Sequence, residues 1–111
     1  MGSFRTVEES IDEETQLVEV HGDVDLKAAR GFREALDEAA QDAKPRLIVD
    51  MSEVPFMDSS GLAALIGAQK SMRARTRMVV VCPENLRRIF EVTRIDSIVD
   101  VVSTLPEALV A

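Results

Sequence analysis

The 111-residue chain has one cysteine, four phenylalanines, no tryptophan and no tyrosine. A single cysteine excludes an internal disulfide framework and is typical of proteins from reducing compartments. The apolar runs are short, and none approaches the ~18–20 residues that a membrane-spanning helix needs. The first residues lack the charged and then apolar pattern of a secretion signal. We therefore expect one soluble, cytoplasmic domain over residues 1–111, with no part in the membrane.

Basic residues are in the minority, because 13 Lys and Arg stand against 20 Asp and Glu, for a net charge of -7. This balance argues against nucleic-acid binding, since contacts to phosphates need clustered Lys and Arg. Seven of the basic residues lie in residues 70–94, together with only two acidic ones. Such a segment is either a solvated face or one half of a complementary surface for a protein partner.

Hydrophobic residues make up 46% of the chain, and their spacing alternates between strand and helix patterns. Short continuous apolar runs are typical of strands that are covered on both faces. The expected strands cover residues 7–11, 17–20, 47–49, 78–82 and 98–102. The expected helices cover residues 26–40 and 59–73, and two shorter ones open at residues 83–84 and 105. This order predicts an α/β fold with an N-terminal β-hairpin, a mixed and mostly parallel sheet and about four helices.

The most informative segment lies between the strand at 47–49 and the next helix. It reads Phe56-Met57-Asp58-Ser59-Ser60-Gly61-Leu62. Open α/β folds place their working sites at this end of the sheet, where the strands finish and the helices begin. Asp58 or Ser59 would be the N-cap, and the free N–H groups of the first turn would stabilise an anion such as a phosphate. Two hydroxyls and a carboxylate exceed what one cap requires, so a plain cap and a functional site both remain open.

Small residues follow on the same predicted helix. They are Gly61, Ala63, Ala64, Gly67 and Ala68. Small side chains at this spacing let another backbone approach closely, and that backbone belongs either to a neighbouring helix of the same chain or to a partner protein.

Residues 56–62 resemble the signature of bacterial anti-sigma factor antagonists, which belong to the STAS domain family. The resemblance extends over nearly the whole chain and includes Gly-Asp-Val-Asp at residues 22–25, where the family usually has Gly-Glu-Leu-Asp. One departure is the glycine pair common before the fourth strand, which Ala-Arg-Thr replaces at residues 74–76. The family's phosphorylated residue directly follows the Asp, so the resemblance places it on Ser59.

The resemblance implies a partner switch. The unphosphorylated antagonist binds an anti-sigma factor that is also a serine kinase, and a sigma factor is released. Phosphorylation inactivates the antagonist, and a PP2C-type phosphatase restores it. The residues expected to contact the partner are Asp25, Asp58, Ser60, Gly61, Ala64 and Gly67. We expect a monomer, with a dimer left open, and neither a metal nor a cofactor.

Three other roles compete with this hypothesis. STAS domains also serve as stress-complex scaffolds, transporter-associated domains and lipid-transport subunits. A hydrolase would need His21, the only imidazole, and Met57 stands where a nucleophile elbow has its first glycine. A response-regulator receiver would use Asp50, yet no acidic pair for Mg²⁺ follows the first apolar strand. We therefore expect a protein that is not an enzyme, and we interpret Cys82 as an inert core residue.

Overall fold

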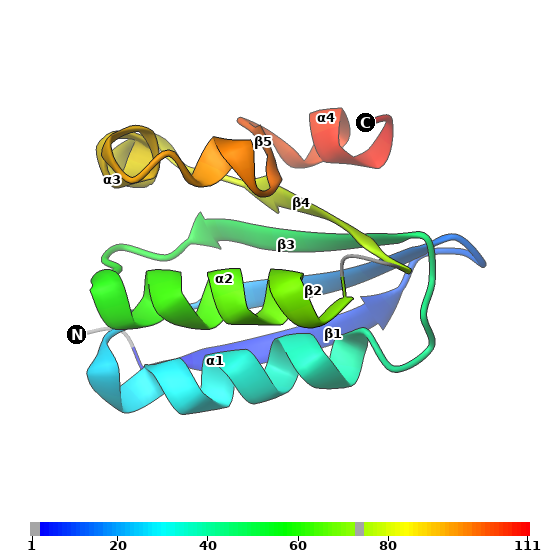
Figure 1. The fold of residues 1–111 in the computed structure, drawn as a ribbon, viewed down its shortest axis with the longest axis horizontal. Coiled ribbons are helices and arrows are strands. Elements are labelled where there is room, and N and C mark those ends of the chain that lie inside the picture. Colours follow the sequence, from blue (N-terminus) through cyan, green and yellow to red (C-terminus); the bar gives the residue numbers. More distant parts are fainter. Residues whose placement is uncertain (1–2, 73–74) are drawn as a thin grey trace.

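The computed structural model describes residues 3–72 and 75–111. Within these residues, five strands form one sheet in the order β1-β2-β3-β4-β5 (Figure 1). The strands are β1 (Arg5–Ser10), β2 (Thr15–His21), β3 (Arg46–Glu53), β4 (Arg77–Val81) and β5 (Asp100–Val102). The β1–β2 pair is antiparallel, whereas β2, β3, β4 and β5 run parallel to one another. The expected α/β fold with an N-terminal hairpin is confirmed.

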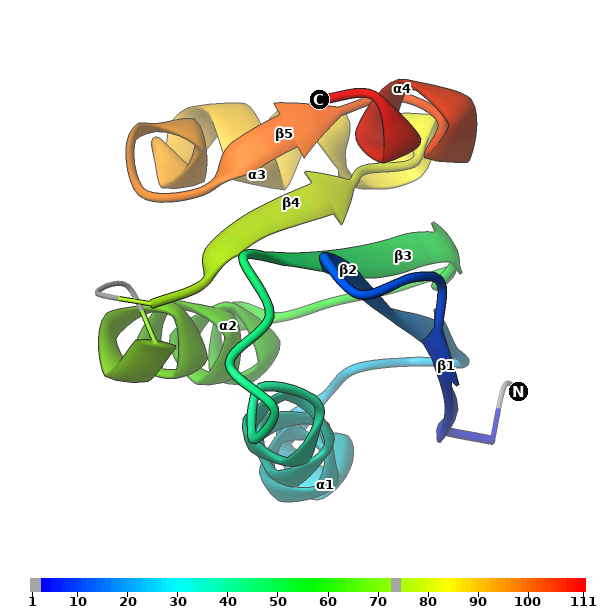
Figure 2. The ribbon, with the colours of Figure 1, turned by 90° about the vertical axis from the view of Figure 1, so that its right-hand side faces the viewer.

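Four α-helices cover the two faces of this sheet in the described part of the chain. They are α1 (Leu26–Ala39), α2 (Ser59–Met72), α3 (Arg87–Val92) and α4 (Leu105–Leu109). Alternate side chains of β3 show how the faces are shared, because successive strand residues point to opposite sides. Leu47 and Val49 belong to the larger core under α1, α2 and α3, whereas Ile48 packs with Ala108 of α4. Figure 2 shows α1 and α2 on one side of the sheet and α4 on the other.

Two helix starts follow the capping rules that their sequences indicate. The Asp25 carboxylate accepts a hydrogen bond from the Ala28 N–H at 3.1 Å, so Asp25 is the N-cap of α1. At α4, the Thr104 hydroxyl accepts from the Glu107 N–H, and the Glu107 carboxylate accepts from the Thr104 N–H. This reciprocal arrangement is a capping box, which the Thr-x-x-Glu spacing favours.

The third helix begins later than expected. Pro83 is extended, with φ -72° and ψ 163°, and a 3-10 turn over Glu84–Leu86 precedes α3. The prediction that Pro83 and Glu84 open an α-helix is therefore wrong by one turn. Leu86 and Phe90 are buried, so the element lies where the apolar pattern indicates although its first turn is tighter.

The last strand is also shorter than the apolar run at 98–102 suggests. Arg94 adopts a left-handed conformation with φ 58°, and a 3-10 turn over Ile95–Ser97 follows it. This turn buries Ile95 and delays the strand, so β5 starts at Asp100 and Ile98 is exposed. The prediction of a five-residue strand is corrected to three residues.

Two expectations fall on residues that the structure does not describe. The second helix was expected to run to Arg73, and Ala74 is the first of the three residues that stand where the family has its glycine pair. Both positions lie outside the described residues. Among those that are described, no helix is long and apolar enough to cross a membrane.

Candidate functional site

The starts of α1 and α2 lie side by side at the carboxyl end of β2 and β3 (Figure 1). A parallel bridge between Val24 and Met57 joins the two segments that lead into these helices. The Val24 N–H donates to the Phe56 carbonyl at 2.9 Å, and the Asp58 N–H donates to the Val24 carbonyl at 3.3 Å. The residues that follow this bridge, Asp25 and Asp58, therefore share one rim of the sheet. We call this rim, with the first turn of α2, the helix-start rim.

Asp58 caps α2. One of its carboxylate oxygens, Oδ1, accepts hydrogen bonds from the Ser60 N–H at 2.9 Å and from the Gly61 N–H at 3.3 Å. Two backbone donors of the first turn are therefore satisfied without any help from the Ser59 hydroxyl. Of the two alternatives that the sequence left for the cap, the structure selects Asp58.

Ser59 is the first residue of α2, and its side chain is exposed. Its hydroxyl has no hydrogen-bond partner within the described part of the chain. Ser60, the next residue, is partly exposed. The Ser59 hydroxyl is therefore open to solvent at the positive end of a 14-residue helix, where a negative charge is stabilised.

Gly61 is buried where the first turn of α2 meets Val24 and Met57. A Cβ atom at this position would lie 2.8 Å from the Val24 carbonyl oxygen and 2.9 Å from Cγ of Met57. The missing side chain thus lets α2 start directly against the bridge between the two segments. The expectation that Gly61 belongs to an open docking surface is corrected: the close approach is made by this chain itself.

Of the other small residues of α2, some pack inside the chain and others lie at its surface. Ala68 is buried, and the guanidinium of Arg33 on α1 lies against Gly67. Ala63 is exposed and Ala64 is partly exposed. Three of the small residues therefore serve packing inside the chain, at Gly61, Gly67 and Ala68, whereas Ala63 and the partly exposed Ala64 reach the surface of α2.

An apolar groove beside this rim was missed by the sequence analysis. It is lined by Pro55, Phe56, Met57, Asn85, Leu86, Arg88, Ile89 and Val92. Phe56 is 51% exposed and Val92 is 71% exposed, and the informative feature is that both line the same groove rather than that either is exposed. The Asn85 amide donates to the carbonyls of Val54 and Pro55 at 3.0 and 2.9 Å and fixes the loop against the start of the third helix. Phe56 lies inside the motif at residues 56–62, and its apolar side chain near Asp58 was the one sequence signal that pointed to this groove.

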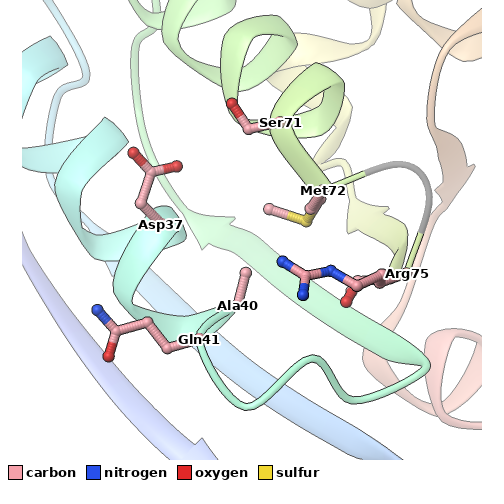
Figure 3. Close-up of a pocket in the computed structure, with 7 residues that line it drawn as sticks. Asp37, Ala40, Gln41, Ser71, Met72 and Arg75 are labelled. Atoms are coloured by element: carbon pink, nitrogen blue, oxygen red, sulfur yellow. The ribbon is translucent and has the colours of Figure 1, made fainter.

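A second hollow lies at the far end of the α1–α2 pair, near the carboxyl ends of both helices (Figure 3). It is lined by Asp37, Ala40, Gln41, Ser71, Met72, Arg75 and Thr76. Two of these side chains are already engaged, because Arg33 binds Asp37 at 3.0 Å and Ser71 at 2.9 Å. A helix of 14 residues spans about 21 Å, so this hollow is remote from Ser59.

The residues of the competing hypotheses have other surroundings. The His21 imidazole lies 3.3 Å from the Glu19 carboxylate, its own neighbour on β2. Asp50 accepts a hydrogen bond from the Ser52 N–H at 3.0 Å. The sheet order with an antiparallel first strand differs from the 2-1-3-4-5 order of receiver-like folds. Cys82 is buried, and burial raises the pKa of its thiol to about 11, so it is protonated at neutral pH.

The fold and the helix-start rim together define a class: small α/β domains that present an exposed serine where a mostly parallel sheet meets its second long helix. The family model of the STAS domain matches residues 6–108. The chain therefore belongs to the STAS domain family, and the resemblance found in the motif is confirmed.

Known relatives are similar over most of this length. The anti-sigma-B factor antagonist of Listeria monocytogenes is 34% identical over 84 residues, which cover 74% of each chain. The crystal structure of an anti-sigma factor antagonist from Mycobacterium paratuberculosis has a TM-score of 0.84 at 26% identity and covers 97% of this chain and 92% of its own. The phosphorylated form of the Bacillus cell fate determinant SpoIIAA shares the fold, with a TM-score of 0.65 at 24% identity and 96% of both chains covered.

Proposed function

We propose that this chain is an anti-sigma factor antagonist whose binding is switched by phosphorylation of Ser59. The observation that supports this most directly is the exposed hydroxyl at the start of α2, which the cap leaves free because Asp58 already satisfies the first-turn donors. The relatives named as anti-sigma factor antagonists point to the same role. The partner would be an anti-sigma factor with serine kinase activity, in the cytoplasm, and a PP2C-type phosphatase would reverse the modification.

The helix-start rim can accept a phosphate without refolding. The first turn of α2 offers the positive end of its macrodipole to a group on Ser59. A phosphoserine would bring roughly -1.5 to -2 charges at neutral pH. Asp25 and Asp58 lie on the same rim, and the chain already has a net charge of -7. A partner surface that accepts the neutral hydroxyl would meet a concentrated negative charge after phosphorylation, and the cost of desolvating that charge would oppose docking.

The proposed docking surface joins the rim to the apolar groove. From the rim it takes Asp25, Asp58, Ser60 and Ala64, whereas Gly61 and Gly67 act beneath it through packing. From the groove it takes the exposed side chains of Phe56 and Val92, which supply apolar area next to the phosphoacceptor. Interfaces commonly combine a buried apolar centre with polar residues around it, and the apolar groove next to these polar side chains supports the proposed surface.

A comparison of phosphate incorporation into the native chain and into Ser59→Ala tests the proposal. The purified chain, Ser59→Ala and the control Ser60→Ala are incubated with ATP and the cognate anti-sigma factor kinase, and phosphate is mapped by mass spectrometry. We expect one phosphate on the native chain and on Ser60→Ala, and none on Ser59→Ala, because only the Ser59 hydroxyl is placed as acceptor.

Binding to the kinase is measured on the unmodified chain, the phosphorylated chain and Ser59→Ala. Ser59→Ala should bind the kinase like the unmodified chain, since the cap does not use its hydroxyl, and the phosphorylated chain should bind at least ~10-fold more weakly, which corresponds to ~1.4 kcal/mol. Phosphate mapped to another residue, or binding that is indifferent to phosphate, would contradict the proposal. Indifference to phosphate would favour a scaffold role without regulated release of a sigma factor.

A further inference from the structure

The two edges of the sheet differ in length and protection. Among the residues that the structure describes, β1 and β5 are the outer strands, and no strand lies beyond either of them. β5 has three residues, whereas β1 has six, of which five are exposed. An edge strand presents alternate unpaired N–H and C=O groups along its outer side. β1 is therefore the long open edge of this sheet.

The side chains of β1 form a regular row on the face away from α1. The register places Arg5 opposite His21, Val7 opposite Glu19 and Glu9 opposite Leu17. Leu17 belongs to the smaller core with Ala108, so this row lies on the α4 face, which α4 leaves uncovered at β1 (Figure 2). Val7 is 40% exposed, and neither Arg5 nor Glu9 has an ion-pair partner within the described residues.

Symmetry restricts how a second copy could pair with this edge. Two antiparallel β1 strands are related by a two-fold axis perpendicular to the sheet, which keeps each face on its own side. Directly opposed residues must then come from the same face. With the axis at Val7, Arg5 opposes Glu9 of the second copy, and the reverse pair forms by symmetry. With the axis at Glu8 two carboxylates oppose each other, and with the axis at Thr6 the Arg5 guanidinium opposes Val7.

We propose that β1 is a self-complementary edge that pairs antiparallel with β1 of a second copy of this chain. The Val7 residues of the two copies oppose each other at the two-fold axis. An Arg5–Glu9 pair lies on either side of them. On the opposite face Thr6 opposes Glu8, so no like charges meet. Opposite charges placed directly across an antiparallel pair stabilise it, and like charges destabilise it.

This dimer is a property separate from the proposed partner switch, and it leaves both helix-start rims accessible to a partner. The two-fold axis reverses the strand direction, so the two helix-start rims point away from each other at opposite ends of a ten-stranded sheet. Both Ser59 hydroxyls stay exposed, and the dimer is bivalent toward the proposed partner. Edge pairing alone buries a small area, so the dimer is concentration-dependent.

Charge reversal tests the register. Sedimentation of the native chain over a wide range of concentration should show a monomer–dimer equilibrium. Arg5→Glu alone and Glu9→Arg alone each oppose like charges twice and should weaken the dimer at least ~10-fold, whereas the double variant should restore it. A mixture of the two single variants should form the mixed dimer, because each then meets opposite charges. Glu13→Arg, in the exposed turn after β1, is the control for net charge.

Cross-linking tests the position of the axis. Val7→Cys should form a disulfide-linked dimer with oxidised glutathione, since directly opposed strand residues fall within disulfide reach. Glu9→Cys is the control, because the two cysteines would then be four residues out of register, or about 13 Å. Cys82 is buried and adds no competing thiol.

A monomer at every concentration, a dimer indifferent to both charge reversals, or equal cross-linking of the two cysteine variants would overturn the proposal. Ser59→Ala should leave the dimer unchanged, so this result is independent of the proposed function.

Discussion

The starts of α1 and α2 use the same backbone arrangement and present different surfaces. Each follows one side of the Val24–Met57 bridge, and each has an aspartate as its cap. The α1 start continues with Leu26 and Lys27, both exposed. The α2 start continues with two hydroxyls and a buried glycine. The comparison separates the two roles: the aspartates stabilise the helices, whereas the Ser59 hydroxyl is not needed by the fold.

Gly61→Ala should have the largest effect on this comparison. Its new methyl group would press on the Val24 carbonyl at 2.8 Å, and a backbone atom cannot move away cheaply. We expect a loss of about 2 kcal/mol in the free energy of unfolding, as is typical of overpacking. Urea denaturation with an unchanged m-value measures it.

Gly67→Ala is the matched control for Gly61→Ala on the same helix. Its methyl group meets only the end of the flexible Arg33 side chain, and alanine favours a helix by up to about 1 kcal/mol over glycine. The expected stability is unchanged or slightly higher. Equal losses in the two variants would show that Gly61 is not the contact that joins the helix starts.

Removing the caps should have an intermediate effect of different size at the two helices. Asp58→Ala leaves two backbone donors of α2 without their acceptor, whereas Asp25→Ala leaves one donor of α1. Caps contribute about 0.5–2 kcal/mol, so we expect the loss for Asp58→Ala to lie toward the upper end and to exceed that for Asp25→Ala. Thermal unfolding of both variants measures the difference, and Asn at each position should recover most of it. A larger loss at Asp25 would reverse the comparison.

Replacing the hydroxyl should have the smallest effect. Ser59→Ala removes an exposed group without a hydrogen-bond partner in the described residues, so its free energy of unfolding should change by less than about 0.5 kcal/mol. The same denaturation series measures it, with Asp58→Ala as the reference. A loss as large as that of Asp58→Ala would assign the hydroxyl to the cap and would remove the argument that it is free for phosphorylation.

The sequence predicted the elements well where local rules decide them. The apolar runs at 47–49 and 78–82 are buried strands, and α1 and α2 begin at the expected residues, 26 and 59. The two errors lie where a 3-10 turn precedes the element, over Glu84–Leu86 before α3 and over Ile95–Ser97 before β5. Burial of Ile95 after the left-handed Arg94 shortens β5, and no residue pattern at 98–102 indicates that turn.

The candidate site depends on both kinds of information. The resemblance of residues 56–62 to the family motif places the phosphoacceptor on Ser59, and this assignment stays a prediction. The groove of Phe56 and Val92 joins segments that are distant in sequence, so only their packing shows it.

The chain by itself determined the order of strands and helices, the acidic charge and the serine that follows a capping aspartate, because periodicity and capping act over a few residues. The tertiary structure alone decided which way the small residues face. The sequence pattern suggests that Gly61 and Gly67 are bare helix surface, but Gly61 is buried against Val24 and Met57, and Arg33 of α1 lies against Gly67. Whether a surface is open depends on what packs against it, and that packing partner is not local in the chain.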